Sequence, residues 1–194
     1  IAGELLPCVF HVSARTVSTH ALNIFGDHSD VMACRQTGFA MLCEGNVQEV
    51  MDLSPVAHLA ALSGKVPFIN FFDGFRTSHE IQKIAVWDYK DLADMCDMDA
   101  VKAFREHALN PEHPAMRGSH ENGDTFFQHR EACNQYYDAL PEVVEKYMGK
   151  INEKLGTNYQ LFNYYGAPDA DRVIIAMGSI CNVAEEVIDY MNAH

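Results

Sequence analysis

Residues 39–72 read FAMLCEGNVQEVMDLSPVAHLAALSGKVPFINFF and contain two apolar runs with a longer stretch between them. The runs at residues 39–43 and 66–72 are almost continuously apolar, which is typical of strands in a parallel sheet covered on both faces. Between them, apolar residues keep a helical period up to Gly64, and Pro55 predicts either a kink or a restart of that helix. This order of strand, helix and strand predicts a βαβ unit with a right-handed crossover.

The flanking sequence extends this α/β pattern. Upstream, the apolar run at residues 8–12 predicts another strand, and residues 16–25 predict a helix that stops at Gly26. Downstream, residues 88–125 are acidic and helical at first, then rich in Pro, Gly, Asn and His, so they predict a surface excursion. A long amphipathic helix is predicted from about residue 128 to residue 155. We therefore expect an α/β fold with a parallel sheet flanked by helices.

A linker composition at residues 163–170 (NYYGAPDA) predicts a domain boundary. After it, RVIIAMGS and NVAEEVIDYM restart the pattern of strand, turn and helix. We expect a first domain over residues 1–165, and residues 166–194 as the first βα unit of a second α/β domain. The sequence does not begin with Met and stops within a predicted helix, and these two features together indicate a piece of a longer polypeptide.

The composition excludes several classes of protein. A hydrophobic share of 48% can form a sizeable core, and a net charge of −13 repels phosphate backbones and anionic lipid. Neither nucleic acid nor a membrane is therefore expected as a partner. The six cysteines form no CxxC pair, so reduced thiols are favoured over a disulfide framework or a metal-cluster motif.

Four histidines fall within one segment, at His107, His113, His120 and His129. Metal ligands must be held on a common face, and prolines and glycines separate these four side chains. We expect solvated or capping histidines and no metal site.

Two short polar motifs leave alternatives open. The run Asp27-His28-Ser29-Asp30 fits either a carboxylate–imidazole pair for proton transfer or a turn whose aspartates accept backbone N–H groups. The turn is the favoured interpretation. Residues 176–179 (AMGS) fit either an anion site before a helix or, as is favoured, a plain turn.

Two arginines lie where α/β sheets bind ligands, beyond the carboxyl ends of strands. Arg15 follows Val12 by three residues, and Arg76 follows the turn at Asp73-Gly74. A guanidinium at such an edge can bind a ligand carboxylate through two charge-assisted hydrogen bonds, or it can pair with a neighbouring acidic side chain. Position alone leaves both interpretations of Arg15 open, and a plain turn remains an alternative for the region of Arg76.

Four stretches resemble one family in sequence and order, namely GELLPCVFHVSAR, HALNIFGDHSDVMACRQTGFAML, FINFFDGFRTSHEIQK and NYYGAPDADRVIIAMGS. They are similar to pyruvate:ferredoxin (or flavodoxin) oxidoreductases, and the similarity covers nearly the whole chain. The resemblance implies a thiamine-diphosphate-binding-type sheet. It places residues 1–165 in the later part of the pyrimidine-side domain that binds thiamine diphosphate and pyruvate. It also implies that residues 166–194 begin a domain like the C-terminal domain of transketolase.

The resemblance further implies an enzyme that oxidatively decarboxylates pyruvate, transfers the acetyl group to coenzyme A and passes electrons to ferredoxin or flavodoxin. The implied cofactors are thiamine diphosphate, Mg²⁺ and 4Fe–4S clusters, with the ligands of Mg²⁺ and of the clusters outside this chain. A homodimer of the full-length chain is implied, in the cytoplasm or in an anaerobic organelle.

Within the chain, the resemblance assigns the pyruvate carboxylate to Arg15, and we expect Asp73 and Arg76 to brace that site from behind. No catalytic residue and no metal ligand is expected among residues 1–194, and this piece alone is not expected to be active. The alternatives are a related enzyme for another 2-oxo acid, or a non-catalytic interaction module that uses the acidic excursion at residues 88–124.

Overall fold

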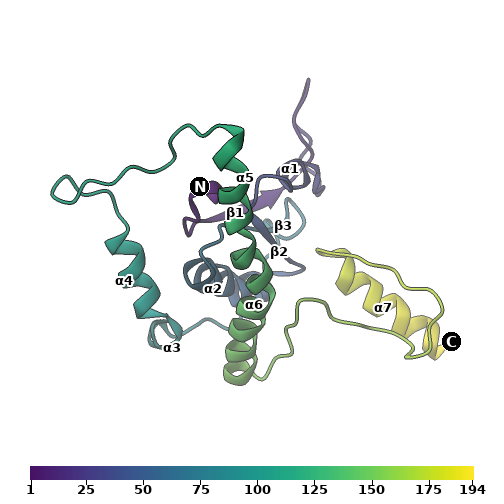
Figure 1. The fold of residues 1–194 in the computed structure, drawn as a ribbon. Helices are drawn as coiled ribbons and strands as arrows, with labels where there is room; N and C mark the ends of the chain where they lie inside the picture. The colour runs from purple at the N-terminus through teal and green to yellow at the C-terminus, as the bar shows by residue number, and fades with distance from the viewer.

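The computed structural model describes residues 1–194 and has an α/β fold built on a three-stranded parallel sheet (Figure 1). The strands are β1 (Val9–Ala14), β2 (Ala40–Glu44) and β3 (Phe68–Asp73), in the order β1-β3-β2. Val9 and Ala40 both pair with Phe68, so the three strands run in register from a common edge. The three expected strands and their parallel arrangement are confirmed.

Helix α2 (Val47–Gly64) connects β2 to β3 and completes the expected βαβ unit. Its first turn is capped by Asn46, whose side chain accepts a hydrogen bond from the Glu49 amide at 2.9 Å. The helix is continuous through Pro55, so it does not restart there.

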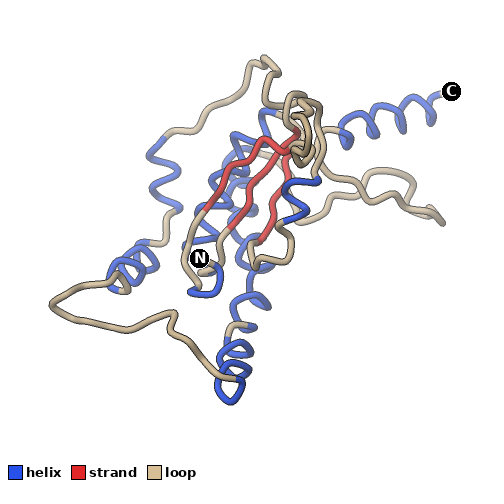
Figure 2. The backbone as a smooth tube through the Cα atoms, turned by 90° about the horizontal axis from the view of Figure 1, so that it is seen from above, coloured by secondary structure: helices blue, strands red, loops and turns tan.

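The main core lies between the sheet, α2 and α6 (Asn134–Leu155), and α6 packs along α2 (Figures 1 and 2). Buried side chains of α6 form the outer part of this core, namely Leu140, Val144, Tyr147, Met148 and Ile151. The expected long helix is confirmed, although α5 (Gly123–Ala132) precedes it as a separate helix, with Cys133 between the two.

The opposite face of the sheet has a smaller apolar cluster. Short helix α1 (Ser29–Ala33) covers part of it, and Val31 of α1 is buried against Ile69 and Phe71. Met41 and Cys43 of β2 are only partly buried on this face.

The side of the sheet that faces α2 changes from apolar to polar along the strands. At the amino ends, Phe68 and its pairing partners belong to the main core. Further along, Asn70 is fully buried and donates hydrogen bonds to His11 Nδ1 at 3.0 Å and to Ser54 Oγ at 3.1 Å. At the carboxyl end of β2, Glu44 is fully buried as well.

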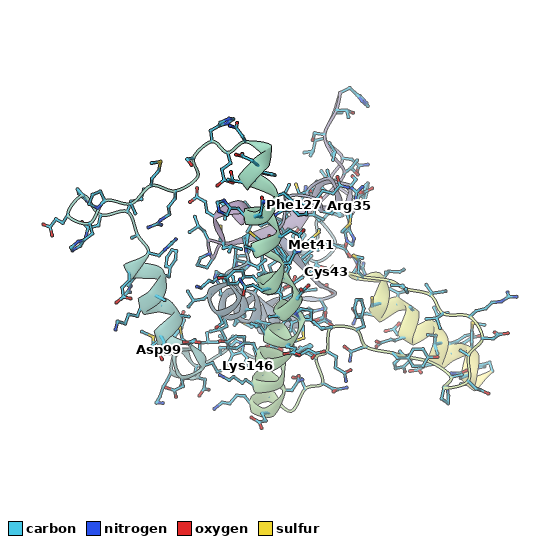
Figure 3. All side chains as sticks on the ribbon, viewed as in Figure 1. Arg35, Met41, Cys43, Asp99, Phe127 and Lys146 are labelled. Carbon is cyan, nitrogen blue, oxygen red and sulfur yellow. The ribbon has the colours of Figure 1, made fainter.

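The predicted surface excursion is confirmed. It contains helices α3 (Tyr89–Met95) and α4 (Met98–Glu106), which carry no buried residues. Figure 3 shows Asp99 of α4 well apart from Met41 of β2. A single turn of 3₁₀ helix, η1 (Ala2–Glu4), begins the chain.

Two sequence predictions are wrong. Residues 16–25 form no helix. The side chains of Leu22 and Phe25 are 65% and 63% exposed, so they bury too little apolar surface to stabilise a helix here. Residues 172–178 form no strand, because no neighbouring strand is present to pair with them. Of the expected second βα unit, the structure contains only helix α7 (Ile180–Ala193). None of the helices combines the length and the apolar character needed to cross a membrane.

Candidate functional site

The candidate site lies at the edge of the sheet where the three parallel strands end. Ala14, Glu44 and Asp73 are the last residues of β1, β2 and β3. Arg15 follows Ala14 directly, so it lies at the strand edge that the sequence predicts for it.

The backbone of Arg15 is fixed by the segment that returns from residues 16–30. The Arg15 amide donates to Asp30 Oδ2 at 2.9 Å, and the Asp30 amide donates to the Arg15 carbonyl at 3.3 Å. Arg15 also forms an isolated antiparallel bridge with Gly26. The loop therefore closes back on the arginine and holds it against the end of the sheet.

Gly74 determines where the side chain of Arg15 can lie. A Cβ atom at Gly74 would come within 2.6 Å of Arg15 Cγ and 2.8 Å of Arg15 Nε, and within 2.5 Å of the Ala14 carbonyl oxygen. The Gly74 amide donates to that same oxygen at 2.8 Å. The arginine side chain thus passes directly over the Gly74 backbone, and a larger residue at position 74 would displace it.

The Arg15 guanidinium has no salt bridge and no hydrogen-bond partner in the structure, although Arg15 is partly buried. This is unexpected in a chain with 27 acidic and 14 basic side chains. The three aspartates of the adjoining loop and strand end, Asp27, Asp30 and Asp73, have other hydrogen-bond partners. Asp27 accepts from the Ser29 amide at 2.5 Å, and Asp30 accepts from the amides of Arg15 and Val31.

Asp73 is occupied in the same way, by two segments distant in sequence. Its Oδ1 lies 2.5 Å from His28 Nε2, and its Oδ2 accepts from the Ser179 amide at 2.6 Å. Burial acts to raise the pKa of Asp73, but the hydrogen bonds from Ser179 and His28 together outweigh it, and the pKa lies below its ordinary value. Asp73 is therefore a carboxylate bound by an imidazole and a backbone amide.

The contacts with Ser179 depend on a second close approach. Gly178 has a φ of +82°, and a Cβ atom there would lie 2.9 Å from Asp73 Oδ2 and 3.1 Å from His28 Cε1. In Figure 3, Cys43 of β2 likewise lies next to the beginning of α7. The turn before α7 thus packs against the strand edge.

These contacts show what the side chains and amides of the two polar motifs, residues 27–30 and 176–179, bind. Asp27 and Asp30 accept backbone N–H groups, as the turn interpretation predicts. The carboxylate partner of His28 is Asp73, which is 45 positions away. The anion held at residues 176–179 is the side chain of Asp73 as well. His28 and Ser179 were missed as partners of Asp73, because no local pattern indicates which strand end they reach.

Arg76 lies at the same edge but is not joined to Arg15 through its side chain. Its amide donates to the Gly74 carbonyl at 2.8 Å, and its side chain is exposed. It lines a shallow pocket of about 290 Å³ together with Phe75, His79 and Glu80. Arg76 thus contacts the site through the backbone of the turn.

The side chains that most often bind metal ions are not clustered in the structure. No set of three or more His, Cys, Asp or Glu side chains is placed to hold a metal ion, and all six cysteines are free.

Comparison with known proteins identifies the family. Residues 1–149 match the family model described as pyruvate flavodoxin/ferredoxin oxidoreductase, thiamine-diphosphate-binding. The matched region includes the whole sheet and Arg15, His28 and Asp73.

The chain is also similar over its full length to part of several larger proteins. It is 64% identical to a pyruvate-flavodoxin oxidoreductase of Enterobacter agglomerans, covering 100% of this chain and 16% of that protein. It is 62% identical to a pyruvate:ferredoxin oxidoreductase of Moorella thermoacetica, covering 98% of this chain and 16% of that protein. A pyruvate dehydrogenase (NADP⁺) of Cryptosporidium parvum is 51% identical over 98% of this chain, which spans 10% of that protein.

The chain thus spans about a sixth or less of the length of these curated relatives. The family model covers most of the chain, and the identities are well above the level at which a common fold and family follow. The chain belongs to the thiamine-diphosphate-binding family of pyruvate flavodoxin/ferredoxin oxidoreductases.

Proposed function

We propose that this chain is part of an enzyme that oxidatively decarboxylates pyruvate with coenzyme A to acetyl-CoA and CO₂, and passes electrons to ferredoxin or flavodoxin. Within it, Arg15 binds the carboxylate of pyruvate. The observation that supports this role is the unpaired guanidinium of Arg15 at the strand edge, with its acidic neighbours occupied by other groups. An arginine whose role is structural would be expected to have one of these carboxylates as its partner.

The chemistry of the substrate fits this arrangement. Pyruvate is a small anion, and a guanidinium can bind its carboxylate through two parallel charge-assisted hydrogen bonds. Because decarboxylation converts that carboxylate to neutral CO₂, Arg15 acts by binding the substrate and orienting the bond that breaks. Thiamine diphosphate, when bound, would supply the nucleophilic carbon and the electron sink that decarboxylation of a 2-oxo acid requires.

The remaining cofactors fit a larger assembly. In our proposal, other parts of the enzyme bind Mg²⁺ and the 4Fe–4S clusters, which fits the lack of any cluster of three or more His, Cys, Asp or Glu side chains here. Coenzyme A and a homodimer of the full-length chain belong to the same proposal, as does a location in the cytoplasm or an anaerobic organelle. The piece alone is not active in this proposal.

Residues 1–165 are proposed to form the later part of the domain that binds the pyrimidine side of thiamine diphosphate and pyruvate. Residues 166–194 are proposed to begin a second α/β domain, of which α7 is the first helix. Asp73 and Arg76 are proposed to brace the pyruvate site from behind. The hydrogen bonds of Asp73 to two segments, and of the Arg76 amide to Gly74, support this role.

Two alternatives differ in what they predict for Arg15. A related enzyme for another 2-oxo acid would use Arg15 in the same way, because the carboxylate is common to these substrates. A non-catalytic interaction module using residues 88–124 would have no use for a free cation at the strand edge. The unpaired Arg15 therefore favours an enzyme.

The test is Arg15→Ala in the full-length enzyme. Loss of a charge-assisted contact of about 1.5–3 kcal/mol lowers kcat/KM for pyruvate by about 10- to 150-fold. Arg35→Ala is the matched control, because Arg35 is exposed and donates to the Met32 carbonyl at 2.8 Å. An unchanged kcat/KM in Arg15→Ala would remove Arg15 from the pyruvate site.

A further inference from the structure

We propose that His28 is a positioning residue that keeps the carboxylate of Asp73 away from Arg15, so that the guanidinium stays free for the substrate. This inference rests on the proposed function, in which Arg15 binds pyruvate. It concerns a different question, namely why the arginine is unpaired in an acidic protein.

The register of the sheet brings Asp73 close to Arg15. Ala14 of β1 pairs with Asp73 of β3, so Arg15 is one residue beyond that pair. The side chain of Arg15 crosses Gly74, the residue directly after Asp73. Asp73 is thus the acidic residue of the neighbouring strand that directly precedes the glycine crossed by the Arg15 side chain.

Asp73 is held back from Arg15 by its two partners. The Ser179 amide occupies Oδ2, and His28 Nε2 occupies Oδ1. His28 is itself fixed by an edge-to-face contact with Phe71, with ring centroids 5.3 Å apart at an interplanar angle of 83°. Its side chain is 20% exposed, and that of Asp73 is 12% exposed. Loss of His28 would leave Oδ1 without a partner in a largely buried site, one residue from the glycine over which the unpaired Arg15 side chain passes.

In that situation Arg15 becomes the available partner for Asp73. A carboxylate attached to the neighbouring strand is always present, so it competes with pyruvate at a high effective concentration. A partly exposed salt bridge of about 0.2–1 kcal/mol weakens the binding of pyruvate by up to about fivefold. The other nearby acids, Asp27 and Asp30, are bound to backbone amides and do not change.

The experiment compares four forms of the full-length enzyme: wild type, His28→Ala, Asp73→Asn and the double variant. We expect His28→Ala to raise KM for pyruvate up to about fivefold with little change in kcat, because only substrate binding is opposed. In the double variant, Asn at position 73 has no charge with which to pair, so KM falls back to that of Asp73→Asn alone. A purely structural role of His28 would give a double variant at least as impaired as His28→Ala.

Two further substitutions of His28 separate packing from hydrogen bonding. His28→Gln retains a side-chain N–H that can donate to Asp73, and its KM is expected to stay near that of the wild type. His28→Phe retains an aromatic ring against Phe71 without a nitrogen, and it is expected to raise KM as His28→Ala does. It also replaces His28→Ala in the comparison if the alanine variant does not fold. His20→Ala is the control from the same loop, because His20 is exposed and contacts Thr19.

The outcomes distinguish this inference from the proposed function. A normal KM in Arg15→Ala would overturn the role of Arg15 in binding pyruvate. A raised KM in Arg15→Ala, with a normal KM in both His28→Ala and His28→Phe, would overturn only the role of His28. A double variant that remains as impaired as His28→Ala would also overturn it. A structure of His28→Ala with Asp73 bound to Arg15 would be direct support.

Discussion

Glu44 of β2 and Asn70 of β3 are both fully buried on the side of the sheet that faces α2, and neither oxygen of the Glu44 carboxyl group has a hydrogen-bond partner. The Asn70 side-chain oxygen is unpaired as well. Burial raises the pKa of Glu44 to about 9, and the Glu49 carboxylate adds to this, while the side chain of Asn70 opposes it. Glu44 is therefore a neutral carboxylic acid at pH 7, and as such it can donate a proton to a neighbouring acceptor.

The first prediction is that the stability of β2 depends on pH through Glu44. The folded form holds a proton that the unfolded chain, with a glutamate pKa of about 4.3, releases. The free energy of unfolding should thus fall by about 1.4 kcal/mol for each pH unit between about 5 and 8. Hydrogen exchange in peptides covering residues 40–64 of the full-length protein measures this. The contribution of Glu44 is the difference between the pH dependence of the unfolding free energy in the wild type and in Glu44→Gln. An equal pH dependence in the two proteins would show that Glu44 is ionised in the folded protein.

A second prediction concerns Gly74. Gly74→Ala places a methyl group 2.5 Å from the Ala14 carbonyl oxygen and 2.6 Å from Arg15 Cγ, so the backbone or the arginine must move. We expect kcat/KM for pyruvate to fall by about tenfold or more, equivalent to about 1.4 kcal/mol.

The matched control is Gly149→Ala, because a Cβ atom at Gly149 on α6 meets no atom within 4 Å. That substitution should stabilise α6 by about 0.5–1 kcal/mol and leave the kinetics unchanged. Normal kinetics in Gly74→Ala would mean that the site of Arg15 tolerates the displacement.

Tyr159→Phe tests how much a hydrogen bond to the buried Asp52 carboxylate on α2 contributes to stability. Asp52 is 2% exposed and accepts from Tyr159 Oη at 2.9 Å and from Gln48 Nε2 at 3.0 Å. Removing the hydroxyl leaves one of these bonds unmade, and we expect a loss of about 1–3 kcal/mol in the protection of α2 against hydrogen exchange. Tyr165→Phe removes a similar bond, 2.5 Å long, to Asp189 at the surface. If Tyr165→Phe loses as much protection against hydrogen exchange as Tyr159→Phe does, the burial of Asp52 is not the cause of the loss in Tyr159→Phe.

Ile151→Ala tests the packing of α6 against α2. The Ile151 side chain is fully buried in the main core, so truncation should cost about 2–5 kcal/mol. Leu155→Ala, one turn later, removes a side chain that is 38% exposed, and it should cost much less. Hydrogen exchange in peptides from α2 and α6 measures the loss of stability in both variants. Equal losses in Ile151→Ala and Leu155→Ala would contradict the position of the core.

The parts of the fold that the sequence predicts are those set by local apolar patterns. The run at residues 66–72 becomes β3 because its residues contact covering layers on both sides of the sheet. The helix expected at residues 16–25 fails because its β-branched residues, Val17 among them, have low helix propensity and no tertiary contact to compensate.

The candidate site is predictable only in part, for a related reason. The position of Arg15 follows from the end of a strand, which is a local feature. The contact of His28 with Asp73 joins residues 45 positions apart, and it depends on the path of a loop and on strand register. Ser179 reaches the same carboxylate from 106 positions away. Nothing in the spacing of these residues indicates that they share a partner.

The change from apolar to polar along the strands separates two kinds of mutational outcome. At Phe68, where β3 begins, a substitution acts on the main core, so its consequence is a change in how much protein accumulates. At Asp73, where the same strand ends, a substitution acts on the carboxylate that we propose braces the pyruvate site, so its expected consequence is a change in the kinetics for pyruvate. A survey of variants along one strand should therefore pass from abundance defects to kinetic defects within six residues.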